Sequence, residues 1–387
     1  MSNEAVITKI HSIEPHPNGD RIEIARVFGD LGFCSVIGKN TWKAGDLCLW
    51  IEPDSVLSDE IDKWLAENSK ISIKNKRLRA TKIRGVISEG LILRPEDFLP
   101  DNKIVEGFDA SGLLGITHYS PPGPSWNCGR KRSKNMFYDN PLFLKYFHID
   151  RFQKHPNVIE IGEPVITTCK RHGQNIRFYL GPKSEKVRKS LWFKIKKLLK
   201  ITTDQEFLVG SHNTIRNPKY TSKDLESDHF LVAAEKYKMK ELMPEIRDFL
   251  GGVCGQNNPL IVYGEVIGYG PTGGPLQIGY NYGFEKGDTG LVIYDICANG
   301  QFLDWSYVDA VCKKFNLPIV ETIYKGPFNK EVLNLAEAVD EYNGQKYNRE
   351  GIVIKPLAMR KDPRIGWVEL KQISKLFLLD KSNSGYH

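Results

Sequence analysis

Five charged residues of this chain have the types and the order that nucleotidyl transfer requires. Lys170 ends a run of β-branched residues and stands three positions before a glycine. Two isolated carboxylates, Glu265 and Glu350, follow far downstream, each in an apolar stretch. Two further lysines follow: Lys355 comes directly after an apolar run, and Lys371 lies in the next apolar stretch. A lysine in this setting can attack a nucleotide α-phosphate and become a covalent lysyl-nucleotide.

Each residue type has a definite use in that reaction. The attacking lysine must be unprotonated, and we expect neighbouring cations and partial burial to lower its pKa. Gly173 lets the backbone turn closely past the nucleotide. Lys355 and Lys371 are candidates to meet the charge that develops at phosphorus. Glu265 and Glu350 are candidates to hold a divalent metal, which bridges phosphate oxygens.

Taken singly, these residues have commoner roles. An isolated glutamate is more often part of a surface ion pair, and an isolated lysine is more often solvated. The ordered set of five favours the chemical interpretation. His172 is better explained as a local hydrogen-bonding residue than as a metal ligand, because no second histidine lies at ligand spacing.

The composition indicates a soluble intracellular protein, which we place in the cytoplasm. The 387 residues are 41% hydrophobic and 26% charged, and no apolar run is long enough to cross a membrane. The N-terminus lacks the pattern of a secretory signal. The seven cysteines are odd in number and include no C-x-x-C pair, which argues for a reducing compartment and against zinc.

The net charge of +7 suits a polyanionic partner without proving one. Residues 183–200 carry eight Lys or Arg against one Glu, with Val187, Leu191, Ile195, Leu198 and Leu199 at helical spacing. We expect an amphipathic helix there with a cationic outer face. A solvated face is the favoured interpretation, a phosphate-backbone contact the functional alternative, and a membrane-surface helix a distant third.

The chain changes character along its length. Short alternating apolar segments and tight turns over residues 5–57 predict a small β-barrel. A basic alternating strand follows over residues 77–85, and its Arg79, Lys82 and Arg84 are either a nucleic-acid contact or the wet face of a sheet. Pro-rich and basic residues over 121–148 predict a linker. Mixed strands and helices fill residues 149–387, with helices expected over residues 228–250 and 329–341.

Several stretches resemble motifs of one protein family. Residues 169–175 (Cys-Lys-Arg-His-Gly-Gln-Asn) are similar to the first motif of ATP-dependent RNA ligases, and residues 350–355 match the fourth closely. Residues 262–268, 294–296 with 302–304, and 370–374 resemble the motifs between and after them. Residues 13–23, 43–57 and 77–91 are similar to the OB-fold leader of Deinococcus-type RNA ligases. The resemblance covers residues 5–380.

This resemblance implies an α+β protein. It implies an N-terminal OB-type β-barrel (residues 1–120), a basic linker (121–148) and a nucleotidyltransferase ligase domain of ATP-grasp-like antiparallel sheets with helices (149–387). It also implies ATP and Mg²⁺ or Mn²⁺ as cofactors, and a nicked duplex with RNA on the 3′-hydroxyl side as the substrate. We expect a monomer. Lys170 would become adenylated, pass AMP to a 5′-phosphate, and the 3′-hydroxyl would then displace AMP.

The resemblance further assigns site residues. The metal ligands would be Glu265 and Glu350, and the basic residues Arg79, Lys82 and Arg84 would hold the duplex. The nucleotide-binding residues would be Lys170, Gly173, Asn175, Ser211, Arg216, Glu265, Tyr294, Lys355 and Lys371.

The chain departs from the family pattern at three points. Cys169 stands where many members have a glutamate that reads adenine, and Glu369 stands where a lysine is frequent. The usual Ser-Arg motif is Ser211-His212 here, with Arg216 as a possible substitute. Two alternatives remain: another covalent nucleotidyltransferase, such as a DNA ligase or guanylyltransferase, and a nucleic-acid-binding protein with an inactive transferase domain. The former usually carry their OB domain after the catalytic domain.

Overall fold

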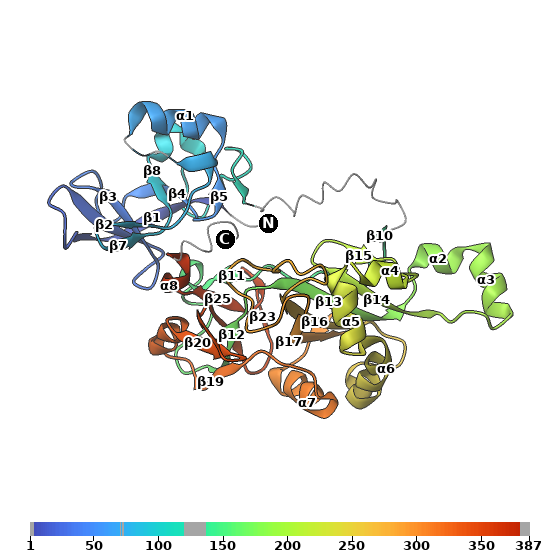
Figure 1. Ribbon diagram of the computed structural model, residues 1–387. Coiled ribbons are helices and arrows are strands. Elements are labelled where there is room, and N and C mark those ends of the chain that lie inside the picture. The colour runs from blue at the N-terminus through green and yellow to red at the C-terminus, as the bar shows by residue number, and fades with distance from the viewer. Residues whose placement is uncertain (1–3, 70, 72, 120–136, 380–387) are drawn as a thin grey trace. The chain divides into compact units, whose positions relative to one another are not determined.

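The computed structural model describes residues 4–69, 71, 73–119 and 137–379 (Figure 1). Their internal contacts divide them into two compact units. The first unit comprises the described residues up to 119, residues 150–159 and residues 375–379; the second comprises residues 137–149 and 160–374. Residues 150–159 and 375–379 therefore group with the N-terminal residues rather than with the ligase domain expected over residues 149–387. Each unit is described by itself.

The first unit is built on an antiparallel five-stranded sheet with the order β3-β2-β1-β4-β8. These strands are β1 (Ala5–Pro15), β2 (Ile22–Val27), β3 (Phe33–Gly38), β4 (Leu47–Ile51) and β8 (Leu91–Leu93). The amide of Glu89 donates to the carbonyl of Cys34 at 2.7 Å, and the amide of Val36 donates to Ser88 Oγ at 3.0 Å. These bonds nearly close the sheet between its edges, as the predicted β-barrel requires.

Alternation of apolar and polar residues explains the strands of this barrel. Inward residues such as Ile7, Phe33 and Trp50 are completely buried. Helix α1 (Asp59–Asn68) begins at Ser58, whose hydroxyl accepts the amide of Ile61. The remaining elements are β5 (Ser55–Val56), β6 (Thr81–Ile83), β7 (Val86–Ser88), β9 (Thr117–His118), β11 (Asp150–Arg151), α8 (Lys375–Leu378) and 3₁₀ turns at Lys74–Lys76, Pro95–Asp97, Asp101–Lys103 and Phe152–Lys154.

The basic segment 77–85 is not the single strand that its alternation predicts. Arg77 is buried and its guanidinium pairs with Asp54 at 2.9 Å. Only Thr81–Ile83 forms a strand, β6, which pairs with β7 across a two-residue loop. Both loop residues, Arg84 and Gly85, have positive φ angles (44° and 96°), which is the geometry of a tight hairpin.

The second unit contains two antiparallel sheets. The larger has the order β10-β15-β14-β13-β16-β17-β18, and the smaller includes the order β25-β22-β12-β19. The larger sheet consists of β10 (Phe137–Tyr138), β13 (Gln174–Pro182), β14 (Gln205–Ser211), β15 (Ile215–Arg216), β16 (Leu260–Gly268), β17 (Thr289–Ala298) and β18 (Gln301–Phe302). The strands that this unit contributes to the smaller sheet are β12 (Pro164–Lys170), β19 (Thr322–Pro327), β22 (Gly351–Pro356) and β25 (Leu370–Ile373).

Three helices pack against the larger sheet: α5 (His229–Lys236), α6 (Met239–Leu250) and α7 (Trp305–Phe315) (Figure 1). Residues 171–173 carry the chain directly from β12 in the smaller sheet to β13 in the larger one. The remaining elements are α2 (Glu185–Lys189), α3 (Leu191–Leu198), α4 (Ser222–Leu225), the hairpins β20 (Val339–Tyr342) with β21 (Gln345–Asn348) and β23 (Lys361–Asp362) with β24 (Gly366–Trp367), and 3₁₀ turns at Gly251–Val253 and Lys330–Ala336.

Residues 137–148, predicted as part of a linker, are instead packed into the second unit; residues 121–136 lie outside the described residues. Phe143 and Tyr146 are buried in the same hydrophobic cluster as Tyr179 and Tyr263. The Pro-rich and basic composition that favoured a linker lies in the preceding residues. The aromatic residues after it provide the apolar surface that packs.

Other predicted helices also differ from the structure. The helix expected over residues 228–250 is two helices, because Lys238 has a left-handed conformation (φ 50°) between α5 and α6. Residues 329–341 form a 3₁₀ turn and then strand β20. No helix among the described residues is long and apolar enough to cross a membrane.

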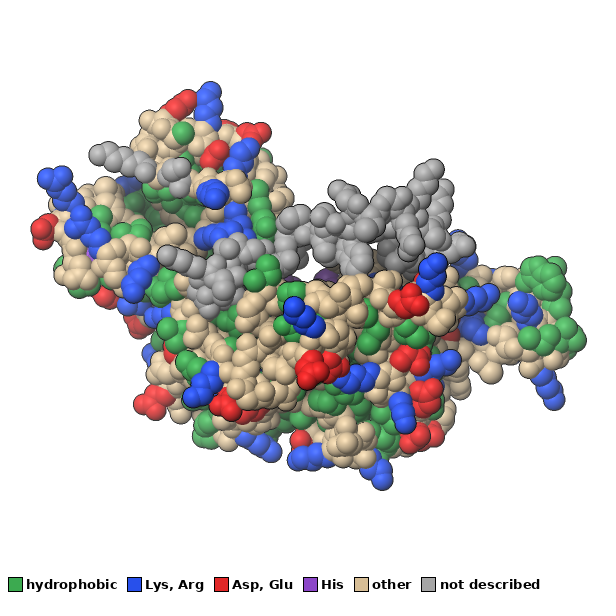
Figure 2. Space-filling view, viewed as in Figure 1, with side chains coloured by type: hydrophobic (Ala, Val, Ile, Leu, Met, Phe, Trp, Pro, Cys, Tyr) green, Lys and Arg blue, Asp and Glu red, His purple; other side chains and the backbone are tan. Residues whose placement is uncertain are grey.

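The basic segment 183–200 forms two short helices, α2 and α3, rather than one. Its expected inner face is largely uncovered: Leu191 is 74% exposed and Leu198 is 82% exposed, while Phe193 is buried. Figure 2 shows hydrophobic side chains and Lys or Arg side chains together at this end of the second unit. The apolar residues recur at helical spacing, as predicted, but most of their side chains are not buried against the rest of the unit.

Candidate functional site

Lys170 and Glu350 form a close ion pair where strand β12 ends and its neighbour β22 begins. In the antiparallel register Lys170 lies opposite Gly351, so the glutamate that precedes β22 comes beside the lysine. Lys170 Nζ lies 2.5 Å from Glu350 Oε1. The lysine side chain keeps 28% of its area exposed, whereas the glutamate keeps 9%. The lysine is therefore both held and open to a ligand.

Glu265 reaches the same place from the larger sheet. It lies on β16 opposite Asn175 of β13, and its Oε1 accepts the amide of Gly173 at 3.1 Å. A Cβ at position 173 would lie 2.3 Å from the carbonyl oxygen of Val266, so no other residue fits without a shift of the backbone. The lysine-x-x-glycine spacing is thus explained by close contact between residues 171–173 and β16.

The electrostatics of the cluster differ from the sequence-based expectation. Burial lowers the pKa of Lys170, but Glu350 and Glu265 more than offset this, so the lysine pKa lies above its ordinary value. Burial raises the pKa of Glu265 to about 8, although Lys170 opposes the change. The groups that act on Lys170 most strongly are carboxylates, not cations. A cation bound to these carboxylates would offset their negative charge and so lower the pKa of Lys170, which favours loss of its proton.

The described residues contain no group of three or more His, Cys, Asp or Glu placed to hold a metal. Glu265 and Glu350 offer two carboxylates around Lys170, and Glu350 Oε2 is buried without a hydrogen-bond partner. Mg²⁺ commonly takes one or two carboxylates and completes its shell with water and substrate phosphates. The pair fits a divalent ion of that kind, bound together with a phosphate.

A second lysine cluster surrounds Lys355 on β22. Its Nζ lies 3.0 Å from Asp295 Oδ2 and donates to the carbonyl of Tyr294 at 3.2 Å. The hydroxyl of Tyr146 lies 2.9 Å from Asp295 Oδ2 and 2.7 Å from Glu369 Oε2. Since that hydroxyl has one proton, a protonated Glu369 can complete the set by donating to the tyrosine oxygen.

The charges of this second cluster are almost entirely removed from solvent. The side chain of Lys355 is 3% exposed and that of Asp295 is 0% exposed. Burial lowers the pKa of Lys355, but Asp295 and Glu369 outweigh it and the pKa is raised. Burial raises the pKa of Glu369 to about 7. Lys371 lies on β25 opposite Val353, and therefore on the same face of the sheet as Lys355.

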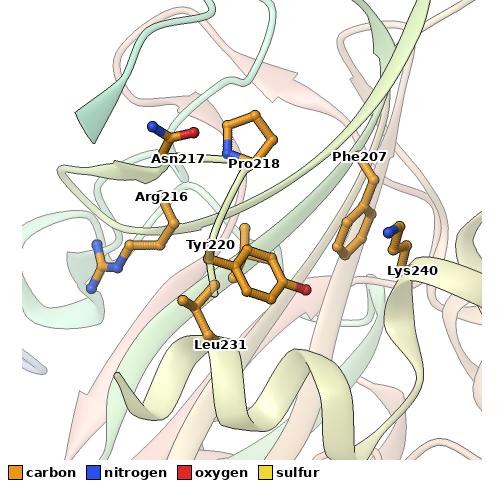
Figure 3. Close-up of a pocket in the computed structure, with 8 residues that line it drawn as sticks. Phe207, Arg216, Asn217, Pro218, Tyr220, Leu231 and Lys240 are labelled. Atoms are coloured by element: carbon orange, nitrogen blue, oxygen red, sulfur yellow. The ribbon is translucent and has the colours of Figure 1, made fainter. Parts of the chain in front are cut away.

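Other residues assigned to nucleotide binding lie at varying distances from these clusters. The side-chain amide of Asn175 donates to the hydroxyl of Tyr294, and Asn175 Oδ1 is buried without a hydrogen-bond partner. Ser211 Oγ is bonded to Thr214 Oγ1 at 2.7 Å. Arg216 pairs with Asp228 at 2.5 Å. It lines a separate pocket, shown in Figure 3, together with Phe207, Asn217, Pro218, Tyr220, Leu231 and Lys240.

No sequence motif predicted the residues that hold the turn after Lys170. The amide of His172 donates to the hydroxyl of Tyr282 at 2.7 Å. The guanidinium of Arg171 lies 5.0–5.6 Å from the rings of three tyrosines, Tyr282, Tyr342 and Tyr347. Burial, and then Lys170, lowers the pKa of His172 to about 3, so its ring is neutral. Only the local density of tyrosines gave any sequence signal for this arrangement.

Cys169 points away from the nucleophile because side chains alternate along β12. Its sulfur lies 3.4 Å from Asp340 Oδ2, and burial raises the pKa of this thiol to about 12. The three basic residues Arg79, Lys82 and Arg84 belong to the first unit, where all three are exposed.

Comparisons with known proteins assign the chain to a family. Residues 163–374 match the RNA ligase family, and residues 4–95 match an OB-fold domain. A comparison with curated proteins finds no match. The structure is similar to Naegleria gruberi RNA ligase with PPi, at 24% identity and a TM-score of 0.69, covering 98% of both chains. A mutant of that ligase with ATP and Mn gives 23% identity, a TM-score of 0.70 and coverage of 99% and 100%. The match of one family over more than half of its length shows that this chain belongs to the RNA ligases.

Proposed function

We propose that this protein is an ATP-dependent RNA ligase that works through a lysyl-AMP at Lys170. One observation carries the proposal: an accessible lysine lies 2.5 Å from one buried carboxylate, and a second, Glu265, accepts the amide of Gly173 three residues further along the chain. The Naegleria ligase mutants whose structures contain ATP and Mn support ATP and a divalent metal as cofactors. The placement of the OB-fold domain before the ligase domain supports the Deinococcus type.

The reaction has three steps. The deprotonated Nζ of Lys170 attacks the α-phosphorus of ATP; an N–P bond forms and the bond to pyrophosphate breaks. A 5′-phosphate oxygen of the nucleic acid then attacks the same phosphorus, and the lysine leaves and takes up a proton. Finally the 3′-hydroxyl loses its proton and attacks the 5′-phosphate, which releases AMP and joins the strands.

The residues of the chain have separate roles in these steps. Glu350 holds Lys170 in place, and Glu350 and Glu265 would hold a divalent ion, Mg²⁺ or Mn²⁺, which would neutralise phosphate charge when bound. Lys355 and Lys371, which share a sheet face, would stabilise the charge that develops at phosphorus. Asn175 has a buried acceptor without a partner, which suits a ribose hydroxyl.

We further propose that the substrate is a nick in a duplex with RNA on the 3′-hydroxyl side. The exposed Arg79, Lys82 and Arg84 would contact its phosphates, so binding should weaken as salt increases. We place a monomer in the cytoplasm, a location supported by the free state of the six cysteines among the described residues.

The first experiment is the intact mass of the purified protein. It is recorded after treatment with pyrophosphate and metal, and again after addition of ATP and metal. We expect an increase of one AMP with ATP that pyrophosphate reverses. Lys170→Ala should lose the adduct entirely while Lys346→Ala, which removes an exposed lysine of β21, retains it.

An AMP adduct on the Lys170→Ala protein would contradict the assignment of the nucleophile. An adduct with GTP in place of ATP would favour a guanylyltransferase. If neither nucleotide gives an adduct and Lys170→Ala leaves duplex binding unchanged, the chain is a nucleic-acid-binding protein with an inactive domain.

A further inference from the structure

The first unit contains a groove that the ligase chemistry does not use. Its volume is about 800 Å³, within the range of sites that bind small molecules. Its apolar walls come from β3, β8 and the residues around β6. Ile37, Leu91 and Ile92 are among these walls, and Trp42 and Tyr119 add two aromatic rings.

Each of the two rings is held in place by an arginine. The guanidinium of Arg94 lies 3.8 Å from the centre of the Trp42 ring, and that of Arg77 lies 3.7 Å from the centre of the Tyr119 ring. Arg77 is itself fixed by the ion pair with Asp54. Rings that are oriented in advance lose little conformational entropy when a flat ligand packs on them.

The charge of the groove has one sign. Among its described lining residues three are cationic and none is acidic. The three are Lys74, Arg77 and Arg79; Arg77 is buried and pairs with Asp54, whereas Lys74 and Arg79 are exposed. Burial, and then the charge of Arg77, lowers the pKa of Arg79, so a nearby anion would be favoured there.

We propose that this groove binds unpaired nucleotides of an RNA strand. Bases have flat apolar faces that pack on aromatic rings, and their phosphates require cations beside them. A double helix is far too large for a cavity of this volume. An acidic peptide would use the positive charge of the groove but would not require two fixed aromatic rings. The inference rests on the proposed function only in taking RNA as the substrate, and it gives the first unit a role beyond phosphate contact.

The probe is a short fluorescein-labelled oligouridylate, whose binding to the whole protein is followed by fluorescence anisotropy without ATP. We expect Trp42→Ala to weaken binding about 5- to 100-fold, as the loss of one or two stacking contacts does. Trp42→Phe keeps an aromatic face and should retain most of the affinity. Arg79→Gln, at an exposed position, should weaken binding and reduce its dependence on salt.

Trp192→Ala is the matched control, because Trp192 is a 72% exposed tryptophan in the lysine-rich helix α3. Loss of affinity in this variant equal to that in Trp42→Ala would overturn the assignment to the groove. So would unchanged binding by both Trp42→Ala and Arg79→Gln, or displacement of the probe by blunt duplex RNA as effective as displacement by unlabelled single strand. Thermal unfolding shows whether each variant folds. If Trp42→Ala does not fold, the affinity of Arg79→Gln decides whether the groove binds the probe.

The AMP adduct is measured on the same wild-type preparation. Its absence, with oligouridylate binding that still depends on Trp42, would refute the proposed function and leave the groove assignment standing. An adduct with oligouridylate binding that does not depend on Trp42 would do the reverse.

Discussion

The second unit contains two lysines that have similar charged neighbours but differ in their exposure to solvent. Each lies beside a directly paired carboxylate and a second carboxylate whose pKa is raised by burial. For Lys170 these are Glu350 and Glu265; for Lys355 they are Asp295 and Glu369. Yet the first lysine is 28% exposed and the second is 3% exposed.

The carboxylates of the two clusters also differ in their hydrogen bonds. Around Lys355, the hydroxyl of Tyr146 lies within 2.9 Å of both carboxylates. Around Lys170, Glu350 Oε2 is buried without a hydrogen-bond partner. The Lys355 cluster is complete in itself and keeps its lysine in one position. The Lys170 cluster is incomplete and open, which suits a group that exchanges partners during a reaction.

The largest expected difference between the clusters is in stability. Lys355→Met leaves Asp295 buried with its charge uncompensated, which should reduce the free energy of unfolding by about 3–5 kcal/mol. Lys170 is 28% exposed, so its replacement opens the paired oxygen of Glu350 to water, and Lys170→Met should cost only about 1 kcal/mol. Urea unfolding of the two variants without metal measures both values.

The same measurement can contradict this difference between the clusters. If the two substitutions cost the same, the Lys170 cluster is structural and its openness has no functional meaning. Lys313→Met, at an exposed lysine of helix α7, controls for the loss of a surface charge.

The sequence predicted the residues of the first cluster far better than those of the second. Lys170, Glu265 and Glu350 stand out because a charged residue interrupts or ends an apolar strand, and the structure brings them together. Tyr146 had no such signal, since it lies in a segment predicted as linker. Its partners are 149 and 223 residues away, and no local pattern reports a contact at that separation.

The same limit applies to the fold. The alternating residues of β1, β4 and β22 predicted strands, and the combination of OB barrel and ligase domain is confirmed. Helix ends and turns were less predictable. The hairpin at Arg84 and Gly85 depends on two positive φ angles, and an arginine in the first position gives no hint of one. The break at Lys238 has the same cause.

A smaller effect is expected from the tyrosine that completes the Lys355 cluster. Tyr146→Phe removes a buried hydroxyl from two carboxylates and should cost about 1–3 kcal/mol of unfolding free energy. Tyr307→Phe is the matched control, because Tyr307 is 40% exposed. Equal stability of the two variants by urea unfolding would show that water or a rearranged carboxyl replaces the hydroxyl, and the cluster would not be complete in itself.

The last expected effect is a dependence of stability on pH. Burial raises the pKa of Glu369 to about 7, from an ordinary value near 4.5. Between these values the folded protein keeps a proton that the unfolded chain has released, so the free energy of unfolding falls as pH rises through this interval. Glutamine does not titrate and still offers an acceptor to Tyr146.

Glu369→Gln should therefore gain stability relative to wild type as the pH is raised from about 5 to about 8, by a few degrees in Tm. Glu341→Gln, at an exposed glutamate of β20, should show no such trend. A constant difference between Glu369→Gln and wild type across this range would mean that Glu369 is ionised in the folded protein. Tyr146 would then donate to only one of two charged carboxylates, and the Lys355 cluster would not be complete in itself.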